Sequence, residues 1–173
     1  MGNNSISQPT DGHGARIVID QGHHEIHAGK YFTSHLYDAD LDNASTLSIL
    51  MRTPATGEIH MFMAAKSTLP GTIDLQESVS CTGGTTIVAY NNHRQSGYVS
   101  TLTLRSDPTV TTAGTVLFQV PLGSTGHPLA IAGGGDGGRP EWILKQSTDY
   151  VFKYTSRTED TLVALIAEWY EES

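Results

Sequence analysis

Hydrophobic and polar residues alternate through most of this chain, and turn-forming residues interrupt the alternation at regular intervals. Leu47, Ile49 and Met51 recur at every second position, which places them on one face of an extended segment. A cluster of Gly, Pro, Asn or Asp follows each run, and successive runs begin about 10 to 14 residues apart. This spacing is typical of antiparallel sandwiches and barrels. The predicted strands cover residues 31–37, 45–52, 58–65, 72–80, 85–90, 98–105, 115–121, 142–144 and 149–155.

Two of these runs also indicate how deeply they lie in the fold. The run 58–65 is apolar on both faces, so we predict a central strand there. In the run 72–80, Ile73 and Leu75 point one way and Asp74 points the other way. This second pattern predicts one face in the core and one face in solvent.

The segment 161–170 fits two kinds of secondary structure. Leu162, Leu165 and Trp169 fit one face of a helix, whereas Val163, Leu165 and Trp169 fit one face of a strand. Sandwiches often close with a last strand inserted centrally, and we therefore predict a strand.

The first 20 residues differ in composition from the rest of the chain. Residues 1–15 are polar and contain Gly and Pro, and residues 16–20 are rich in β-branched side chains. We predict a flexible N-terminal arm with a short strand over residues 1–20. Residues 21–173 then form a single all-β domain, an antiparallel β-sandwich of jelly-roll-like arrangement. A glycine-rich stretch at 132–140 is expected to be a mobile surface loop.

Composition and charge narrow the range of functions. The 173 residues are 38% hydrophobic and only 16% charged, with a net charge of −8, which disfavours binding to nucleic acid. Cys81 is the sole cysteine, so the chain has no internal disulfide. No apolar run approaches the roughly 18 residues of a membrane span. Residues 1–10 lack the basic start and apolar run of a signal peptide.

A histidine cluster, His23-His24-Glu25-Ile26-His27, is the most conspicuous candidate for chemistry. On a helix Glu25 stands in the wrong place for the zinc-protease motif, while on a strand His23, Glu25 and His27 share one face. A cupin-type metal enzyme is the alternative, but His60 lacks the sequence context that such a site needs. We therefore predict no metal, no cofactor and no catalytic residue, and a protein that is not an enzyme.

Several segments together resemble virion proteins of tailed bacteriophages, of the head-decoration or capsid-cement type. The resemblance lies in residues 23–32, 50–54, 91–94, 141–145 and 168–171. It implies a β-sandwich that forms homotrimers on the capsid exterior and stabilises the capsid by binding neighbouring major capsid protein subunits. Such a protein is made in the host cytoplasm. The alternative is a carbohydrate- or receptor-binding module of a phage tail or fibre.

The expected assembly surface lies near the N-terminus. Ile17, Val18 and Ile19 can pair with a sheet edge, and an exposed strand of this kind would invite aggregation. We expect this segment to dock across a subunit boundary by strand addition. His23 and His24 complete the predicted interface, for which the expected partners are the major capsid protein and further copies of this chain, without nucleic acid or membrane.

Overall fold

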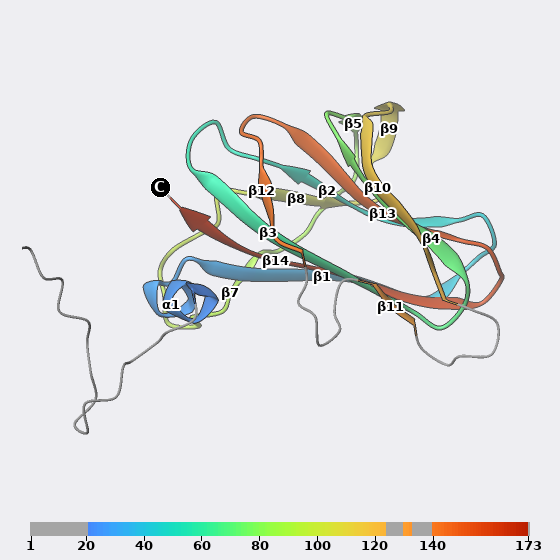
Figure 1. Cartoon of the computed structure of the whole chain (residues 1–173), viewed down its shortest axis with the longest axis horizontal. Helices are drawn as coiled ribbons and strands as arrows, with labels where there is room; N and C mark the ends of the chain where they lie inside the picture. Colours follow the sequence, from blue (N-terminus) through green and yellow to red (C-terminus); the bar gives the residue numbers. More distant parts are fainter. Residues whose placement is uncertain (1–20, 124–129, 133–139, 173) are drawn as a thin grey trace, which may run out of the picture.

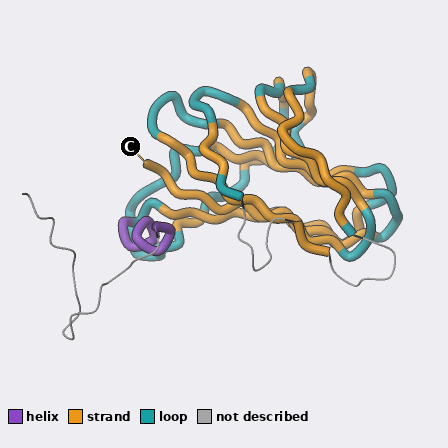
Figure 2. Tube along the Cα trace, in the orientation of Figure 1, coloured by secondary structure: helices purple, strands orange, loops and turns teal. Residues whose placement is uncertain are grey.

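Two antiparallel β-sheets pack against each other in the computed structural model of this protein (Figure 1). The structure describes residues 21–123, 130–132 and 140–172. In that part of the chain strands predominate, and the one helix, α1 (Gln21–Ala28), lies beside the first sheet (Figure 2). The prediction of an all-β, antiparallel sandwich is confirmed. The predicted arm at 1–20 and most of the predicted loop at 132–140 lie outside the described residues.

The first sheet has the strand order β11-β3-β14-β1-β7, and β12 also pairs with β3. Its long members are β3 and β14, which lie inside the sheet, and β1 beside them. Because β3 has partners on both sides, the prediction of a central strand there is confirmed. The bounds are β1 (Tyr31–Leu41), β3 (Glu58–Ser67), β7 (Tyr90–Asn91), β11 (Ala130–Ala132), β12 (Trp142–Leu144) and β14 (Thr161–Glu172).

The second sheet has the strand order β10-β4-β13-β2-β8-β6. Strands β5 and β9 form a separate two-stranded ribbon, and Cys81 on β5 packs against Leu50 and Val151 of the second sheet. The bounds are β2 (Thr46–Arg52), β4 (Gly71–Glu77), β5 (Ser80–Thr82), β6 (Thr85–Thr86), β8 (Thr103–Ser106), β9 (Thr109–Thr112), β10 (Thr115–Leu122) and β13 (Asp149–Ser156).

The strand pairing is nested, because early strands pair with late ones. In the first sheet β1 pairs with β14, and in the second sheet β2 pairs with β13. The successive strands β1, β2, β3 and β4 alternate between the two sheets. This arrangement is compatible with a jelly roll, which stays a prediction beyond the two-sheet packing itself.

The core lies between the sheets and follows the alternation of the sequence. Leu47, Ile49 and Met51 all face it, as predicted. Near one end of the core the rings of Phe32 and Trp169 stack at 5.7 Å. A buried side chain of this size contributes about 1.5 to 3 kcal/mol through removal of apolar surface from water.

The ambiguous segment 161–170 is part of a strand, which confirms the prediction. In β14 every second side chain, including Val163, Leu165 and Trp169, is fully buried. The strand pairs with β1 on one side and β3 on the other. Two neighbouring strands thus satisfy its backbone groups, and this long-range pairing decides against the helix.

Three of the predicted strands are shorter than expected, and one of them, the run 72–80, already ends at Glu77. The run 85–90 contains only the two-residue strands β6 and β7, and the run 98–105 becomes strand only at Thr103. In the run 98–105 the cause is Glu171, whose carboxylate accepts hydrogen bonds from the backbone N–H of Thr101 and from the Ser100 hydroxyl. These bonds draw the backbone at 100–101 towards the end of β14 and out of a ladder.

The prediction that Asp74 is solvated is wrong. Its side chain is buried on the outer face of the second sheet, 3.4 Å from Lys153 Nζ and accepting a hydrogen bond from Gln76 Nε2 at 2.8 Å. Lys153 lies on the neighbouring strand directly opposite Asp74. Cross-strand pairing therefore compensates a carboxylate that the alternation alone assigns to solvent.

Candidate functional site

The predicted interface residues are only partly described. Ile17, Val18 and Ile19 lie outside the described residues, so their docking stays a prediction. His23 and His24 are on α1, and both are exposed. The helix ends at Gly29, whose positive φ of 74° and N–H bond to the Ile26 carbonyl oxygen form a C-terminal cap.

This segment is a helix, so of the two arrangements considered for His23, Glu25 and His27 the shared strand face does not occur. His23 and His27 are one helical turn apart, and their Nε2 atoms lie 3.1 Å from each other. Glu25 is on another side of the helix, buried, where Oε1 accepts a hydrogen bond from Gln21 and contacts His24 Nδ1 at 3.0 Å. The carboxylate thus belongs to the packing of the helix and not to the histidine pair.

One edge of the second sheet is open. Strand β10 (Thr115–Leu122) pairs with β4 on one side, and no other strand of the described residues pairs with its other side. It is eight residues long, and Val116 and Val120 are 51% and 39% exposed. A long, apolar strand edge of this kind is a template for pairing with another chain.

An apolar pocket of about 300 Å³ adjoins this edge. It lies where β10 meets the first sheet, and the ring of Trp142 on β12 stacks on Phe118 of β10 at 5.9 Å. Trp142 is half-buried here, whereas Trp169 is fully buried. The pocket is lined by Met63, Ile73, Phe118, Val120, Pro140, Trp142 and Phe152. It offers space for an apolar side chain beside an unpaired backbone edge.

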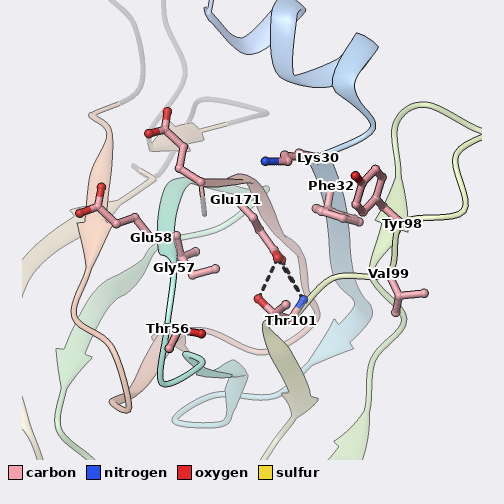
Figure 3. Close-up of a pocket in the computed structure, with 11 residues that line it drawn as sticks. Lys30, Phe32, Thr56, Gly57, Glu58, Tyr98, Val99, Thr101 and Glu171 are labelled. Carbon is pink, nitrogen blue, oxygen red and sulfur yellow. Dashed lines mark hydrogen bonds between the residues drawn. The ribbon is translucent and has the colours of Figure 1, made fainter.

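A second pocket, of about 400 Å³, opens where β14 ends and β3 begins (Figure 3). Tyr98, 61% exposed, lines one side together with Lys30, and Glu58 lines the other side. Glu171 forms hydrogen bonds with the backbone N–H and the hydroxyl of Thr101 at 3.0 and 2.7 Å. These bonds make Glu171 a structural anchor for one wall of the pocket.

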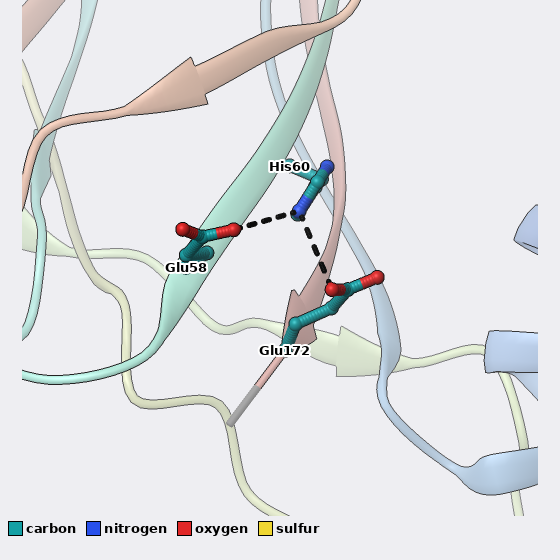
Figure 4. Close-up of side chains that lie close together, drawn as sticks. All are labelled: Glu58, His60 and Glu172. Atoms are coloured by element: carbon teal, nitrogen blue, oxygen red, sulfur yellow. Dashed lines mark ion pairs between the residues drawn. The ribbon is translucent and has the colours of Figure 1, made fainter.

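Beside this pocket, His60 faces two glutamates (Figure 4). His60 Nε2 lies 3.6 Å from Glu58 Oε2 and 4.0 Å from Glu172 Oε2. The three ligand atoms lie within 4.8 Å of one another and belong to residue types that bind metals. Glu58 and His60 come from the start of β3, and Glu172 comes from the end of β14.

The other ring nitrogen of His60 is held from behind by a second group. Glu141, just before β12, accepts hydrogen bonds at Oε1 from the Tyr170 hydroxyl at 2.6 Å and from His60 Nδ1 at 2.7 Å. The hydrogen bond from Tyr170, followed by that from His60, keeps the pKa of Glu141 below its ordinary value. Burial, reinforced by the bond to Glu141, raises the pKa of Tyr170. The carboxylate is therefore ionised and the phenol neutral around neutral pH.

Sequence reasoning missed this cluster. It found no context for His60 and assigned no role to Glu141. The two-residue spacing of Glu58 and His60 within a predicted strand is the one local signal, because it places both side chains on the same face. Glu141 and Glu172 are 81 and 112 positions from His60, and only the pairing of β3 with β12 and β14 brings them close.

The fold belongs to the class of antiparallel β-sandwiches, which host many unrelated functions. No family model matches this sequence, and the comparison found no matching curated protein or solved structure. Among the described residues no helix has the length and apolar character needed to cross a membrane.

Proposed function

We propose that this protein is a non-enzymatic virion component that decorates and stabilises a bacteriophage capsid from the outside. In this role it binds neighbouring major capsid protein subunits and assembles with itself as a homotrimer. The resemblance of five sequence segments to head-decoration proteins supports the virion role. The open edge at β10, beside the apolar pocket, is the structural observation that favours an assembly protein.

Strand addition at β10 is the proposed mode of assembly. A strand that pairs with this edge gains backbone hydrogen bonds, and one of its side chains can enter the pocket beside Phe118 and Trp142. The segment Ile17-Val18-Ile19 has the β-branched composition that suits this position. We assign it as the donor, from a neighbouring copy of the chain.

The position of α1 supports a donor from another copy. Residue 17 is four positions before Gln21, so at full extension it reaches about 14 Å from the helix. The helix contacts β1, which is separated by β14 and β3 from β11 and β12, the strands of the first sheet that lie towards β10. The segment is thus tied to the far side of the first sheet from the edge that it is proposed to extend.

Deleting residues 1–20 tests the donor. We expect the circular dichroism spectrum and thermal midpoint to stay unchanged, because the described core does not include these residues. Light scattering should report loss of the trimer, and binding to capsids stripped of the protein should weaken at least tenfold. Loss of the fold would assign the segment to its own core, and unchanged assembly would contradict the proposal.

Substitutions at the acceptor edge test the other half of the contact. Val120→Lys places a charge beside the pocket and should abolish self-association. Val110→Lys is the matched control, because Val110 is similarly exposed, at 41% against 39%, but lies on β9 outside the edge. If both variants assemble alike, β10 is not the acceptor. Particles purified from the host should also carry the protein on the capsid surface, as immuno-electron microscopy would show.

A receptor- or carbohydrate-binding module is the second candidate. The observation in its favour is the exposed ring of Tyr98 at a pocket that Lys30 and Glu58 also line, since aromatic faces and charged groups together recognise sugars (Figure 3). Binding of the full chain to a glycan array, lost in Tyr98→Ala, would establish this function. Its absence together with capsid binding would leave the decoration role.

A further inference from the structure

We infer that Glu58, His60 and Glu172 form a binding site for one divalent transition-metal cation of the zinc class. This inference is independent of the proposed virion role. It concerns the first sheet, at the point where the start of β3 lies beside the end of β14 (Figure 4).

In the described part of the chain, one ring nitrogen of His60 is buried and unsatisfied. His60 is only 8% exposed, and within the described residues its Nε2 atom is buried without a hydrogen-bond partner. Leaving a buried polar atom unpaired costs about 1 to 3 kcal/mol. This nitrogen points towards the carboxylates of Glu58 and Glu172 (Figure 4). A cation among the three groups would give it a partner.

Contacts with Glu141 and Tyr170 fix the orientation of the His60 ring. The Glu141 carboxylate accepts the hydrogen bond from Nδ1 at 2.7 Å, which leaves Nε2 as the ring nitrogen that can bind a cation. The ring also stacks on Tyr170 at 4.4 Å between centroids, with 13° between the planes. A histidine that donates one N–H to a carboxylate and offers the other nitrogen is the usual arrangement around bound metals.

The distances from His60 Nε2 to the two glutamate oxygens are close to those around a zinc ion. Zinc bonds of about 2.0 to 2.2 Å place tetrahedral ligands about 3.4 Å apart. His60 Nε2 is already 3.6 Å from Glu58 Oε2 and 4.0 Å from Glu172 Oε2. The side chains of Glu58 and Glu172 are 59% and 46% exposed, so they are free to close the remaining gap around a fixed imidazole.

The ligand set determines which ions fit. Calcium and magnesium prefer all-oxygen sites, whereas an imidazole with carboxylates suits zinc and related transition metals. The three ligands leave one tetrahedral position for water or for a donor atom from a bound molecule. Glu58 and Glu172 also line the pocket beside Tyr98, so that position would be reached from the pocket.

Zinc titration of the full chain, stripped with chelator, tests the site by calorimetry. The main variant is Glu58→Gln/Glu172→Gln, whose two exposed side chains can change without disturbing the core. The matched control is His23→Gln/His27→Gln, because the exposed pair on α1, with nitrogens 3.1 Å apart, is a second place where zinc could bind. We expect the glutamate variant to lose affinity at least tenfold and the control to keep it.

Two further measurements read the same site directly. Nitrogen-15 NMR should show zinc shifting His60 Nε2, with Nδ1 protonated beforehand, in the control as in the unmodified protein. Zinc should raise the thermal midpoint of both proteins but not that of Glu58→Gln/Glu172→Gln. No binding up to millimolar zinc overturns the inference, as does binding that survives the glutamate variant and disappears in the α1 variant.

Discussion

The short strand β12 is held at both ends by a tyrosine and a glutamate, but the two attachments balance charge differently. At its C-terminal end, Lys145 and Tyr150 bind Glu77 of the second sheet. At its N-terminal end, Glu141 binds Tyr170 and His60 of the first sheet. β12 therefore links the two sheets through a matched pair of polar contacts.

The attachment at Glu77 is complete within the chain. Each carboxylate oxygen has its own donor, Lys145 Nζ at 2.7 Å and the Tyr150 hydroxyl at 2.9 Å. The same hydroxyl accepts a hydrogen bond from the backbone N–H of Lys145 at 2.9 Å. A lysine on one side and a phenol on the other thus give both oxygens of this carboxylate a donor.

The attachment at Glu141 uses an imidazole in place of the ammonium group. His60 donates one N–H to Glu141 and directs its other nitrogen at Glu58 and Glu172. Negative charge accumulates there instead of being neutralised by a lysine. The same tyrosine–glutamate contact thus has a lysine as its third member at Glu77 and, at Glu141, a histidine whose second nitrogen faces further carboxylates.

Tyr150→Phe should have the largest effect on stability. The substitution removes a buried hydroxyl with two partners and leaves the Lys145 N–H and one oxygen of Glu77 unpaired. We expect the free energy of unfolding to fall by about 2 kcal/mol in urea titration. Tyr98→Phe is the control, since its side chain is 61% exposed, and it should change little. Equal losses for the two variants would contradict this account.

Tyr170→Phe should cost less, about 1 kcal/mol, because its hydroxyl makes one hydrogen bond, to Glu141. The ring would still stack on His60. Denaturation of both tyrosine variants under the same conditions gives the comparison. A loss larger than that of Tyr150→Phe would mean that the attachment at Glu141 is the stronger of the two.

Alkaline pH should weaken the attachment at Tyr150 in a defined window. Burial raises the pKa of Tyr150 from 10 to about 12. The unfolded chain therefore loses this proton first, so stability is complete below pH 10 and falls as the pH rises towards 12. Thermal midpoints between pH 9 and 12 should fall less steeply in Tyr150→Phe. An identical slope in the variant would show that this phenol does not contribute.

Acid should have the smallest effect, acting on both attachments. The hydrogen bond from Lys145 lowers the pKa of Glu77, and that from Tyr170 lowers the pKa of Glu141, each below the ordinary 4.5. Their stabilisation is present above that value and is lost as the pH falls through the folded-state pKa. Glu77→Gln and Glu141→Gln should each flatten the decline of the thermal midpoint below pH 4.5. An unchanged decline in both variants would contradict this account.

Much of the sandwich follows from local pattern in the sequence. The alternation of Leu47, Ile49 and Met51 predicts their shared buried face, and turn residues mark most strand ends, because side chains on a strand must alternate between core and solvent. The same reasoning fails at Asp74, whose neutralising lysine lies on another strand, and at 98–102, where Glu171 holds the backbone. In both places a partner distant in sequence overrides the local preference.

The sequence of 161–170 fits the period of a helix and that of a strand equally well. Tertiary structure decides for the strand, because β1 and β3 pair with the two edges of β14. The group around His60 depended on tertiary structure still more strongly. The two-residue spacing of Glu58 and His60 is read directly from the sequence and places both side chains on one face of a strand. Glu141 and Glu172 join them through the register of three paired strands, and register depends on which faces are buried across the whole sheet.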